Sequence, residues 1–285
     1  MRRHELTDLE WELLAPLIPR AATGRPRVPD RQVINGMVYK IRTGVSWRDL
    51  PERYGPWQTV YTRFRRYALD GVFTRALQQI QADADAVGDI DWLVQIDSTI
   101  VRAHQHSAAT GRKGDQPAGR TGDHALGRSR GGLTTKIHLA CDGRGRPLAV
   151  LLTPGQRHDS TCARPLLERI RVPRMGLGRP RCRPDQVVAD KAYSSRGFRA
   201  YLRKRGIACT IPEKTDQKRH RHNRGYRGGR PPAFDRQLYR RRNVVERCFN
   251  QLKGFRGIAT RYDKTATSYE AAVNLASFLL WARSV

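Results

Sequence analysis

The sequence predicts an α/β fold in which a mixed sheet is flanked by helices and preceded by a small all-α domain. Three observations predict it. Residues 6–83 carry helical periodicity with capping signals, the apolar pattern changes to strand type from Trp92, and strands and helices then follow one another to the end of the chain. An acidic, glycine-containing stretch at residues 83–91 separates the two patterns, so we expect domains at residues 1–85 and 90–285.

The first domain is predicted to contain four helices, at residues 7–18, 30–42, 46–53 and 57–69. The first opens with a capping box at Thr7 and stops at Pro19, and Thr43-Gly44 ends the second. The short third helix, a Tyr54-Gly55-Pro56 turn and the longer fourth helix form a helix-turn-helix arrangement.

The fourth helix is the expected DNA-recognition helix. Its polar side chains would contact base edges and phosphates, whereas its aromatic residues can pack inward. The candidate DNA-binding residues are Gln58, Thr59, Thr62, Arg63 and Arg66. A plain helical bundle with a basic exterior explains the same pattern, and the net charge of the chain favours the DNA-binding interpretation.

Strand-type segments begin at Trp92 and are separated by helices. We expect strands at residues 92–96, 134–141, 148–153, 186–189 and 208–211, and helices at 159–170, 195–205, 239–253 and 268–283. Three strands, helix, strand, helix, strand, helix is the element order of a ribonuclease H-like fold. Residues 103–132 are expected to form a mobile loop, and the basic residues 213–234 a flexible loop that leads into the helix at Tyr239.

The charge balance is strongly basic and indicates a polyanionic partner. Lys and Arg number 54 against 26 Asp and Glu, which gives a net charge of +28. An excess of this size favours double-stranded DNA over a merely solvated surface. No apolar run reaches the length of about 18 residues that a membrane span needs, and the N-terminus lacks a signal-peptide pattern, so the sequence predicts a cytoplasmic protein that does not enter a membrane.

Cysteine and histidine patterns do not indicate a disulfide framework or a zinc site. The five cysteines are widely spread, with no C-x-x-C pair. The pairs His104/His106 and His220/His222 lack a third ligand at useful spacing, which favours polar loops over metal sites.

The most informative segment lies near the C-terminus, where Tyr239, Arg242, Glu246 and Lys253 fall at offsets of 0, 3, 7 and 14. At 100° per residue they share an arc of about 60° on one face of a helix. An adjacent stripe, Leu238, Val245, Phe249 and Leu252, would dock this helix on the core. A carboxylate placed beside Arg and Lys suits a metal ion and a phosphate.

This Y-x2-R-x3-E-x6-K spacing resembles the signature of bacterial insertion-sequence transposases of the DDE class, in the branch named for these four letters. The segments Gln95-Ile-Asp97-Ser-Thr and Val187-Val-Ala-Asp190-Lys-Ala-Tyr193 resemble the first and second acidic motifs of that family, in the same order. Together the motifs cover most of the chain.

The resemblance implies a catalytic, metal-binding triad of Asp97, Asp190 and Glu246. It also implies that Arg242 and Lys253 contact DNA phosphates near the cut and that Tyr239 helps to hold the strand. The expected reaction is two-metal hydrolysis at each transposon end, followed by transfer of the 3′ hydroxyl to target DNA. Mg²⁺ is the expected ion because it prefers oxygen ligands, with Mn²⁺ as a substitute. A homodimer on DNA is expected, since two ends are cut together.

Each acid has a plainer interpretation when it is taken alone. Asp97 and Asp190 each follow a strand, where aspartate commonly forms a turn. Glu246 lies among arginines, where surface ion pairs are common. Two different functions also stay open: a transcriptional regulator that uses the N-terminal helices, and a structure-specific nuclease that cuts without joining. The 56 positions between Asp190 and Glu246 leave no room for the large strand-rich insertion found in some members of the branch.

Overall fold

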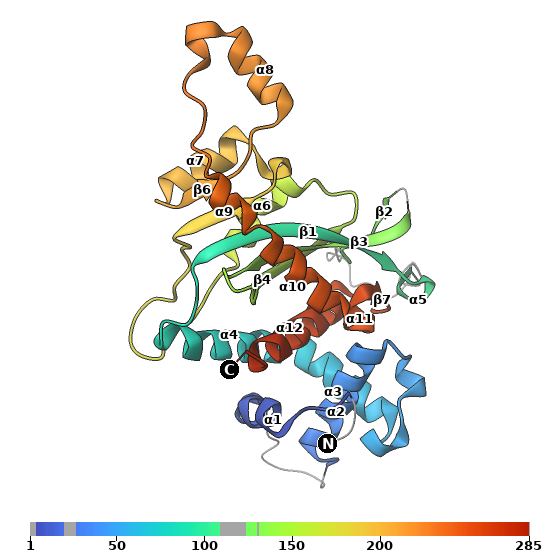
Figure 1. The fold of residues 1–285 in the computed structure, drawn as a ribbon. Coiled ribbons are helices and arrows are strands. Elements are labelled where there is room, and N and C mark those ends of the chain that lie inside the picture. The colour runs from blue at the N-terminus through green and yellow to red at the C-terminus, as the bar shows by residue number, and fades with distance from the viewer. Residues whose placement is uncertain (1–3, 20–26, 109–123, 130, 285) are drawn as a thin grey trace, which may run out of the picture.

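The computed structural model describes residues 4–19, 27–108, 124–129 and 131–284, in which a mixed sheet is packed between helices (Figure 1). The N-terminal helices are α1 (Asp8–Leu14), α2 (Asp30–Thr43), α3 (Trp57–Leu69) and α4 (Val72–Ala86). The strands are β1 (Leu93–Ala103), β2 (Gly127–Ser129), β3 (Gly132–Cys141), β4 (Pro147–Pro154), β5 (Gln186–Ala189), β6 (Ala208–Thr210) and β7 (Thr260–Arg261). The later helices are α5 (Gln105–Ala108), α6 (Asp159–Glu168), α7 (Arg196–Lys204), α8 (Thr215–Asn223), α9 (Arg236–Arg240), α10 (Asn243–Lys253), α11 (Arg256–Ala259) and α12 (Ala266–Ala282).

The helices α2 and α3 begin and end within one residue of the predicted bounds, whereas the first helix, expected to residue 18, ends as α1 at Leu14 and continues as a 3-10 turn, η1 (Ala15–Leu17). Thr7 and Glu10 make both hydrogen bonds of the capping box, and Gly44 ends α2 with a φ of 76° that favours glycine. The continuous helix expected over residues 46–53 is wrong. Two short 3-10 turns, η2 (Trp47–Asp49) and η3 (Glu52–Tyr54), take its place because Pro51 has no N–H to donate and Leu50 before it is extended.

The sheet has the strand order of the predicted ribonuclease H-like fold. Five of its strands lie in the order β4-β3-β1-β5-β6, and the short strands β2 and β7 pair with β3 and β1. The strands β4, β3 and β1 pair antiparallel, whereas β1, β5 and β6 pair parallel. The predicted fold class is therefore confirmed. The expected end of the first strand at Asp97 is wrong, because β1 continues to pair with β3 through Arg102↔Thr134.

Helices cover both faces of β1, and successive side chains of this strand point alternately to one face and to the other. Gln95, Asp97 and Thr99 face α10, which crosses the strand in Figure 1, and Ser98 faces α6 on the other side. The buried positions Val94 and Ile96 fill the α6 face. Asp97 therefore lies between a buried sheet and a helix, in the middle of a strand that is paired on both sides.

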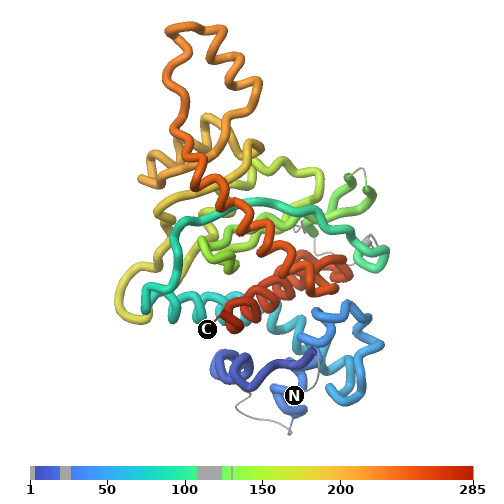
Figure 2. Tube along the Cα trace, in the orientation of Figure 1, coloured from blue at the N-terminus to red at the C-terminus, as the bar shows by residue number. Residues whose placement is uncertain are grey.

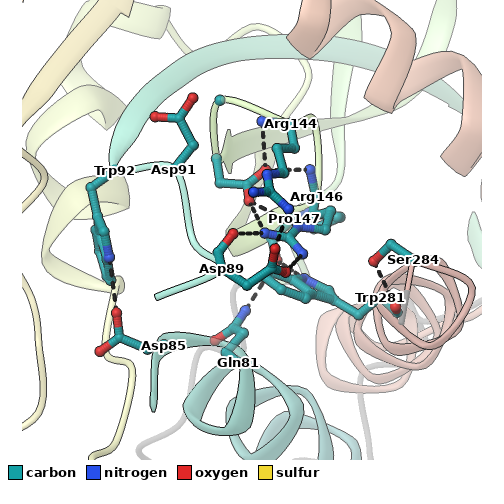
Figure 3. A network of polar contacts seen from close by, with 12 residues as sticks. Gln81, Asp85, Asp89, Asp91, Trp92, Arg144, Arg146, Pro147, Trp281 and Ser284 are labelled. Atoms are coloured by element: carbon teal, nitrogen blue, oxygen red, sulfur yellow. Dashed lines mark hydrogen bonds and ion pairs between the residues drawn. The ribbon is translucent and has the colours of Figure 1, made fainter. Parts of the chain in front are cut away.

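A single apolar core joins the N-terminal helices to the sheet. The C-terminal helix α12 packs along α4 and β4, with Asn274 donating to Thr74 at 2.9 Å. Trp281 of α12 donates to the carbonyl of Pro147 at 2.6 Å, and Gln81 of α4 donates to the same oxygen at 3.0 Å (Figure 3). The boundary expected at residues 86–90 falls at the end of α4, and the core passes beneath it without interruption.

An ion-pair cluster closes the turn between β3 and β4 beside this core. Arg146 lies over the Trp281 ring, 4.1 Å from its centroid, and contacts Asp89 and the fully buried Asp142 (Figure 3). The two Arg146–Asp142 side-chain hydrogen bonds measure 2.9 and 2.7 Å. The predicted turn is thus fixed by a buried charge pair that also holds the acidic segment after α4.

The basic segment at residues 213–234 is not the structureless loop that its composition predicts. It forms α8 and a 3-10 turn, η5 (Gly225–Gly228), which project from the sheet as an arm (Figures 1 and 2). Gln217 holds the base of α8 by donating to the Ser194 carbonyl at 2.8 Å, and Arg221 pairs with Glu213 at 2.6 Å. None of the α8 residues is buried, so local capping and ion pairs, rather than a core, support this helix.

Two further expectations concern residues 103–132 and 239–253. Residues 109–123, most of the loop expected at 103–132, lie outside the described residues. The single helix expected at 239–253 is divided into α9 and α10, with Arg241 and Arg242 in a turn between them. The amides of residues 241, 242, 244 and 245 bond three residues back, which tightens the chain locally to 3-10 geometry. Within the described ranges, no helix combines the length and apolarity that a membrane crossing requires.

Candidate active site

Two of the candidate acids lie at adjacent positions of the sheet, Asp97 within β1 and Asp190 directly after the end of β5. The parallel pairing of β1 with β5 ends at Ile96↔Ala189, and Asp97 and Asp190 each follow directly. Neighbouring strands are about 4.8 Å apart, so these carboxyl groups lie close together although 93 positions separate them in the sequence. Asp190 also caps the following 3-10 turn by accepting from Ala192 N at 2.8 Å, so it has the turn-forming role that its position suggests as well.

Arg242 joins the third acid to the first. Its Nη1 donates to Asp97 Oδ2 at 2.8 Å, and its Nη2 donates to Glu246 Oε1 one helical turn away. The Glu246 side chain is 48% exposed, whereas those of Arg242 and Asp97 are 22% and 21% exposed. Burial raises the pKa of Asp97 above its usual value, repulsion from Asp190 adds to the rise, and Arg242 and the Ser98 amide oppose it.

Polar contacts between β1 and α10 hold this arrangement. Gln95, which is fully buried, accepts from the backbone amide of Val245 at 3.3 Å, and Lys253 donates to Thr99 at 2.7 Å. Sequence reasoning quoted Gln95 and Thr99 within the first acidic motif but gave them no role. The period of two through Gln95, Asp97 and Thr99 is the signal that places all three on the face of α10.

Tyr239 of the C-terminal motif and two residues of the second acidic motif lie near this group. Tyr239, in α9, is half-buried, and its ring lies 5.2 Å from that of Phe234. Lys191 is exposed next to Asp190, whereas Tyr193 is buried. Burial raises the pKa of Tyr193 well above its usual value, and the charges of Asp159, Asp97 and Asp190 reinforce this, so the phenol stays protonated beside the acids.

Asp159, at the start of α6, belongs to a separate cluster on the opposite face of the sheet and has no predicted role. It accepts from Ser98 Oγ at 2.7 Å and from Lys136 Nζ at 3.0 Å. His138 lies 3.9 Å away and is fully buried, and this burial lowers its pKa to about 4, so the ring stays neutral near pH 7. Through Ser98, the neighbour of Asp97, this cluster fixes β1 on the face of the sheet opposite α10.

The three carboxylates are the right donor types for a hard divalent ion, with Arg242 between two of them. Within the part of the chain that is described, no group of three or more His, Cys, Asp or Glu side chains is arranged to hold a metal ion. The guanidinium of Arg242 pairs with both Asp97 and Glu246 and offsets one of their two negative charges. The donor set fits a divalent ion once that arginine releases the two carboxylates.

The expected recognition helix α3 presents only part of its predicted surface. Gln58, Thr62 and Arg66 are exposed, and Thr59 is half-buried. Arg63 turns back into the protein, where it donates to the Val28 carbonyl at 3.0 Å, to Asp30 and to the Tyr67 hydroxyl at 3.1 Å. The guanidinium of Arg63 thus ties α3 to the start of α2.

Known proteins resemble both parts of the chain. Residues 90–281 match the family described as "Transposase DDE domain", and residues 6–77 match the family described as "Putative transposase of IS4/5 family". The "Putative transposase for insertion sequence element IS6501" of Brucella ovis is 32% identical over 53% of this chain and 100% of its own length. The "Putative transposase for insertion sequence element IS402" of Burkholderia cepacia is 33% identical over 56% of this chain and 68% of its own.

A solved complex also aligns with the chain. The "Mos1 transposase paired-end complex with left transposon end" covers 84% of this chain and is itself covered to 82%, at 10% identity and a TM-score of 0.25. The family match to residues 90–281 spans well over half of the 285 residues and includes all three candidate acids. The chain therefore belongs to the DDE transposase family of insertion sequences, metal-dependent enzymes that cleave DNA and transfer its strands.

Proposed function

We propose that Asp97, Asp190 and Glu246 form the catalytic site of this transposase and bind two Mg²⁺ ions, which Mn²⁺ can replace. The observation that carries the proposal is the arrangement of the three acids. Asp97 and Asp190 each directly follow the last residue pair between β1 and β5, and a single arginine joins Asp97 to Glu246. When bound, the divalent ions supply activation of the attacking oxygen and stabilisation of the leaving oxygen at the scissile phosphate.

The protein side chains would orient the DNA at these acids. Arg242 and Lys253, which contact Asp97 and Thr99 of β1, would bind phosphate oxygens and offset negative charge that develops during cleavage, and Tyr239 would help to hold the strand. Gln95 would fix α10 against β1, which keeps Glu246 near the other two acids. The expected products are a free 3′ hydroxyl at each element end and then a strand joined to target DNA.

A metal-dependent cleavage and joining experiment tests this function. The purified protein is incubated with DNA carrying the ends of the sequence that encodes it, together with a target plasmid. We expect cut ends and joined products in Mg²⁺ or Mn²⁺, and neither product in excess EDTA. Cut ends without joined products would indicate a nuclease, and DNA binding without either product would indicate a regulator.

Arg242 gives a second test, because it competes with metal ions for two carboxylates. Replacing Arg242 with Ala removes the hydrogen bond to Asp97, a charge-assisted bond between two mostly buried side chains that is worth about 1.5–3 kcal/mol, so Mn²⁺ binding without DNA is expected to tighten by about tenfold. Cleavage is expected to fall by about 10²- to 10³-fold, since a cation near the scissile phosphate is lost. Calorimetric titration with Mn²⁺ and a cleavage assay measure the two effects.

Arg241→Ala is the matched control for Arg242→Ala. Arg241 is the preceding residue and also pairs with a carboxylate, Asp91 at 2.7 Å, but that acid is outside the proposed triad. Metal affinity and cleavage in Arg241→Ala should stay within about twofold of wild type. Metal binding that Arg242→Ala leaves unchanged or weakens would contradict the proposed competition.

We propose that DNA recognition and catalysis divide between residues 1–85 and 90–285. Gln58, Thr59, Thr62 and Arg66 of α3 are proposed to contact the element ends, whereas the internal bonds of Arg63 give it a structural role. Two ends require two sites, so we propose a homodimer on DNA. An enzyme that acts on a bacterial genome would work in the cytoplasm, in association with the nucleoid.

The arm formed by α8 and η5 is proposed to bind DNA phosphates. Residues 213–234, which contain the arm, hold seven Lys and Arg against two acids, and Lys218 and Arg219 of α8 are exposed. Replacing both with Gln should reduce the slope of log affinity against log salt by about 0.9 per lost phosphate contact. Fluorescence anisotropy with duplex DNA over a salt series measures the slope. The paired change Arg164→Gln and Arg171→Gln, at exposed positions outside the arm, should leave the slope unchanged.

A further inference from the structure

A cavity of about 680 Å³ lies between the N-terminal helices and the far end of β1, away from the acids. One wall comes from α2, η2 and α3, and the other from residues 104–106 and 262–268. Its volume is within the range of about 300–1,000 Å³ that is typical of ligand sites. No part of the function proposed above uses this cavity.

Aromatic rings form both walls of the cavity. Trp47, Trp57 and Tyr61 come from the helical side, and His104, His106 and Tyr262 from the opposite side. The ring centroids of Trp47 and Tyr61 are 5.5 Å apart. Those of His104 and Tyr262 are 5.0 Å apart, and the two ring planes are tilted by 37° relative to each other. None of these six side chains is fully buried, and cations already lie over some of the rings: Arg48 is 5.9 Å from the Trp57 centroid and Lys40 is 5.3 Å from the Trp47 centroid. A planar ligand would enter between the walls by displacing the exposed Arg48 from Trp57.

Positive charge surrounds these rings. Lys40 and Asp263 are both buried at the cavity, with their charged atoms 3.6 Å apart, and largely neutralise each other. The cations Arg48, Arg65 and Lys264 are exposed at its edge, and no ion pair to an acid is recorded for them within the described residues. The cavity therefore combines flat aromatic surfaces with cations that lack acidic partners, which is the chemistry of a nucleotide site.

The cavity is connected to the acids by two continuous segments. His104 follows β1 seven residues after Asp97, a distance of about 23 Å along a strand. The chain from Glu246 through α10, α11 and β7 leads to Tyr262. A DNA strand that follows β1 away from the acids would thus reach the cavity.

We infer that this cavity binds an unpaired nucleobase of the DNA engaged at the acids. The base stacks between the aromatic walls, and Arg48, Arg65 and Lys264 contact the phosphates on either side of it. A base still paired within a duplex cannot enter, because its faces are covered by its stacked neighbours. This inference rests on the proposed function, since it takes DNA to be bound at Asp97.

The test compares three DNA probes with the full-length protein. They are a blunt 20-base-pair duplex, the same duplex with a five-nucleotide single-stranded tail, and the tailed duplex with abasic sites throughout the tail. Anisotropy at about 0.15 M salt, where exposed charges are largely screened, measures affinity. Wild type is expected to bind the intact tail about tenfold more tightly than the abasic tail, because base stacking adds to phosphate contact.

Two variants locate the effect. Trp57→Ala and Tyr262→Ala, one from each wall, should each remove most of the preference for the intact tail and leave binding of the blunt duplex unchanged. Tyr262→Phe keeps the ring and should keep the preference. Tyr201→Ala is the matched control, because Tyr201 is also half-buried and contacts two arginines but belongs to α7, outside the cavity. This control should behave as wild type.

The possible failures are distinguishable. Equal wild-type affinity for intact and abasic tails would overturn the cavity assignment, while binding of the blunt duplex would leave the proposed DNA partner standing. A preference for the intact tail that survives in both Trp57→Ala and Tyr262→Ala would place the base elsewhere and also overturn it. Failure of wild type to bind any of the three probes would overturn the DNA-binding proposal itself.

Discussion

Glu246→Gln is expected to lower DNA cleavage and strand joining by more than about 100-fold while DNA binding stays within about twofold of wild type. The amide keeps the shape of the side chain but loses the negative charge that would hold a divalent ion. Changes to residues that merely support a metal ligand cost 10- to 100-fold, and a ligand itself should cost more. Gel analysis of end-labelled DNA in Mg²⁺, with binding measured in parallel, gives both quantities.

The fold should tolerate this change. Glu246 is 48% exposed, and its ion pair with Arg242 contributes at most about 1 kcal/mol to folding. Glu168→Gln is a close control, because Glu168 is 46% exposed and pairs with an arginine four residues away, on α6. The control should cut at the wild-type rate. Cleavage by Glu246→Gln within threefold of wild type would exclude Glu246 from the proposed triad.

Trp281→Ala is expected to reduce the free energy of unfolding by about 3–5 kcal/mol, the usual cost of deleting a buried Trp side chain. Trp281 is fully buried in α12, lies against Arg146 and donates to the Pro147 carbonyl at 2.6 Å (Figure 3). Such a loss is a large fraction of the 5–15 kcal/mol that typically stabilises a folded protein. Urea denaturation followed by circular dichroism measures it.

Trp281→Phe separates packing from hydrogen bonding. Phenylalanine keeps an aromatic ring beneath Arg146, and the Pro147 carbonyl keeps its bond from Gln81, so we expect a smaller loss than in Trp281→Ala. If the free energy of unfolding of Trp281→Ala lay within about 1 kcal/mol of the wild-type value, the contact between α12 and β4 would not be a main source of stability.

The fold was predictable where short-range signals and burial agree. The capping box at Thr7 and the strand at residues 186–189 are local patterns, and both occur as expected. The extension of β1 beyond Asp97 depends on its pairing with β3, which no local pattern encodes. The sequence did not predict the helix α8, because so charged a segment cannot form a packed core. In the structure α8 forms without a core, supported by the hydrogen bond from Gln217 and the Arg221–Glu213 ion pair.

The candidate site was predictable in its residue types and only partly in its contacts. Register pairing brings Asp97 beside Asp190, which the two strand ends implied. The contact of Arg242 with Glu246 is the i,i+4 pair that a helix predicts, whereas its hydrogen bond to Asp97 depends on α10 crossing β1, which no local pattern encodes. Arg63 is a second contact that the sequence did not predict. It was expected on the DNA-binding surface, but it donates hydrogen bonds to Asp30 and to the Val28 carbonyl.

The uninterrupted core has a consequence for how such elements diversify. Because α4 and α12 share apolar contacts, the first 85 residues are not an interchangeable module that recombination can exchange freely between relatives. Swapping this region would bring a foreign surface against α12. If α3 recognises the element ends as proposed above, gradual substitution at exposed positions such as Gln58 and Thr62 avoids that mismatch, and point mutation is then the easier evolutionary route to new terminal repeats.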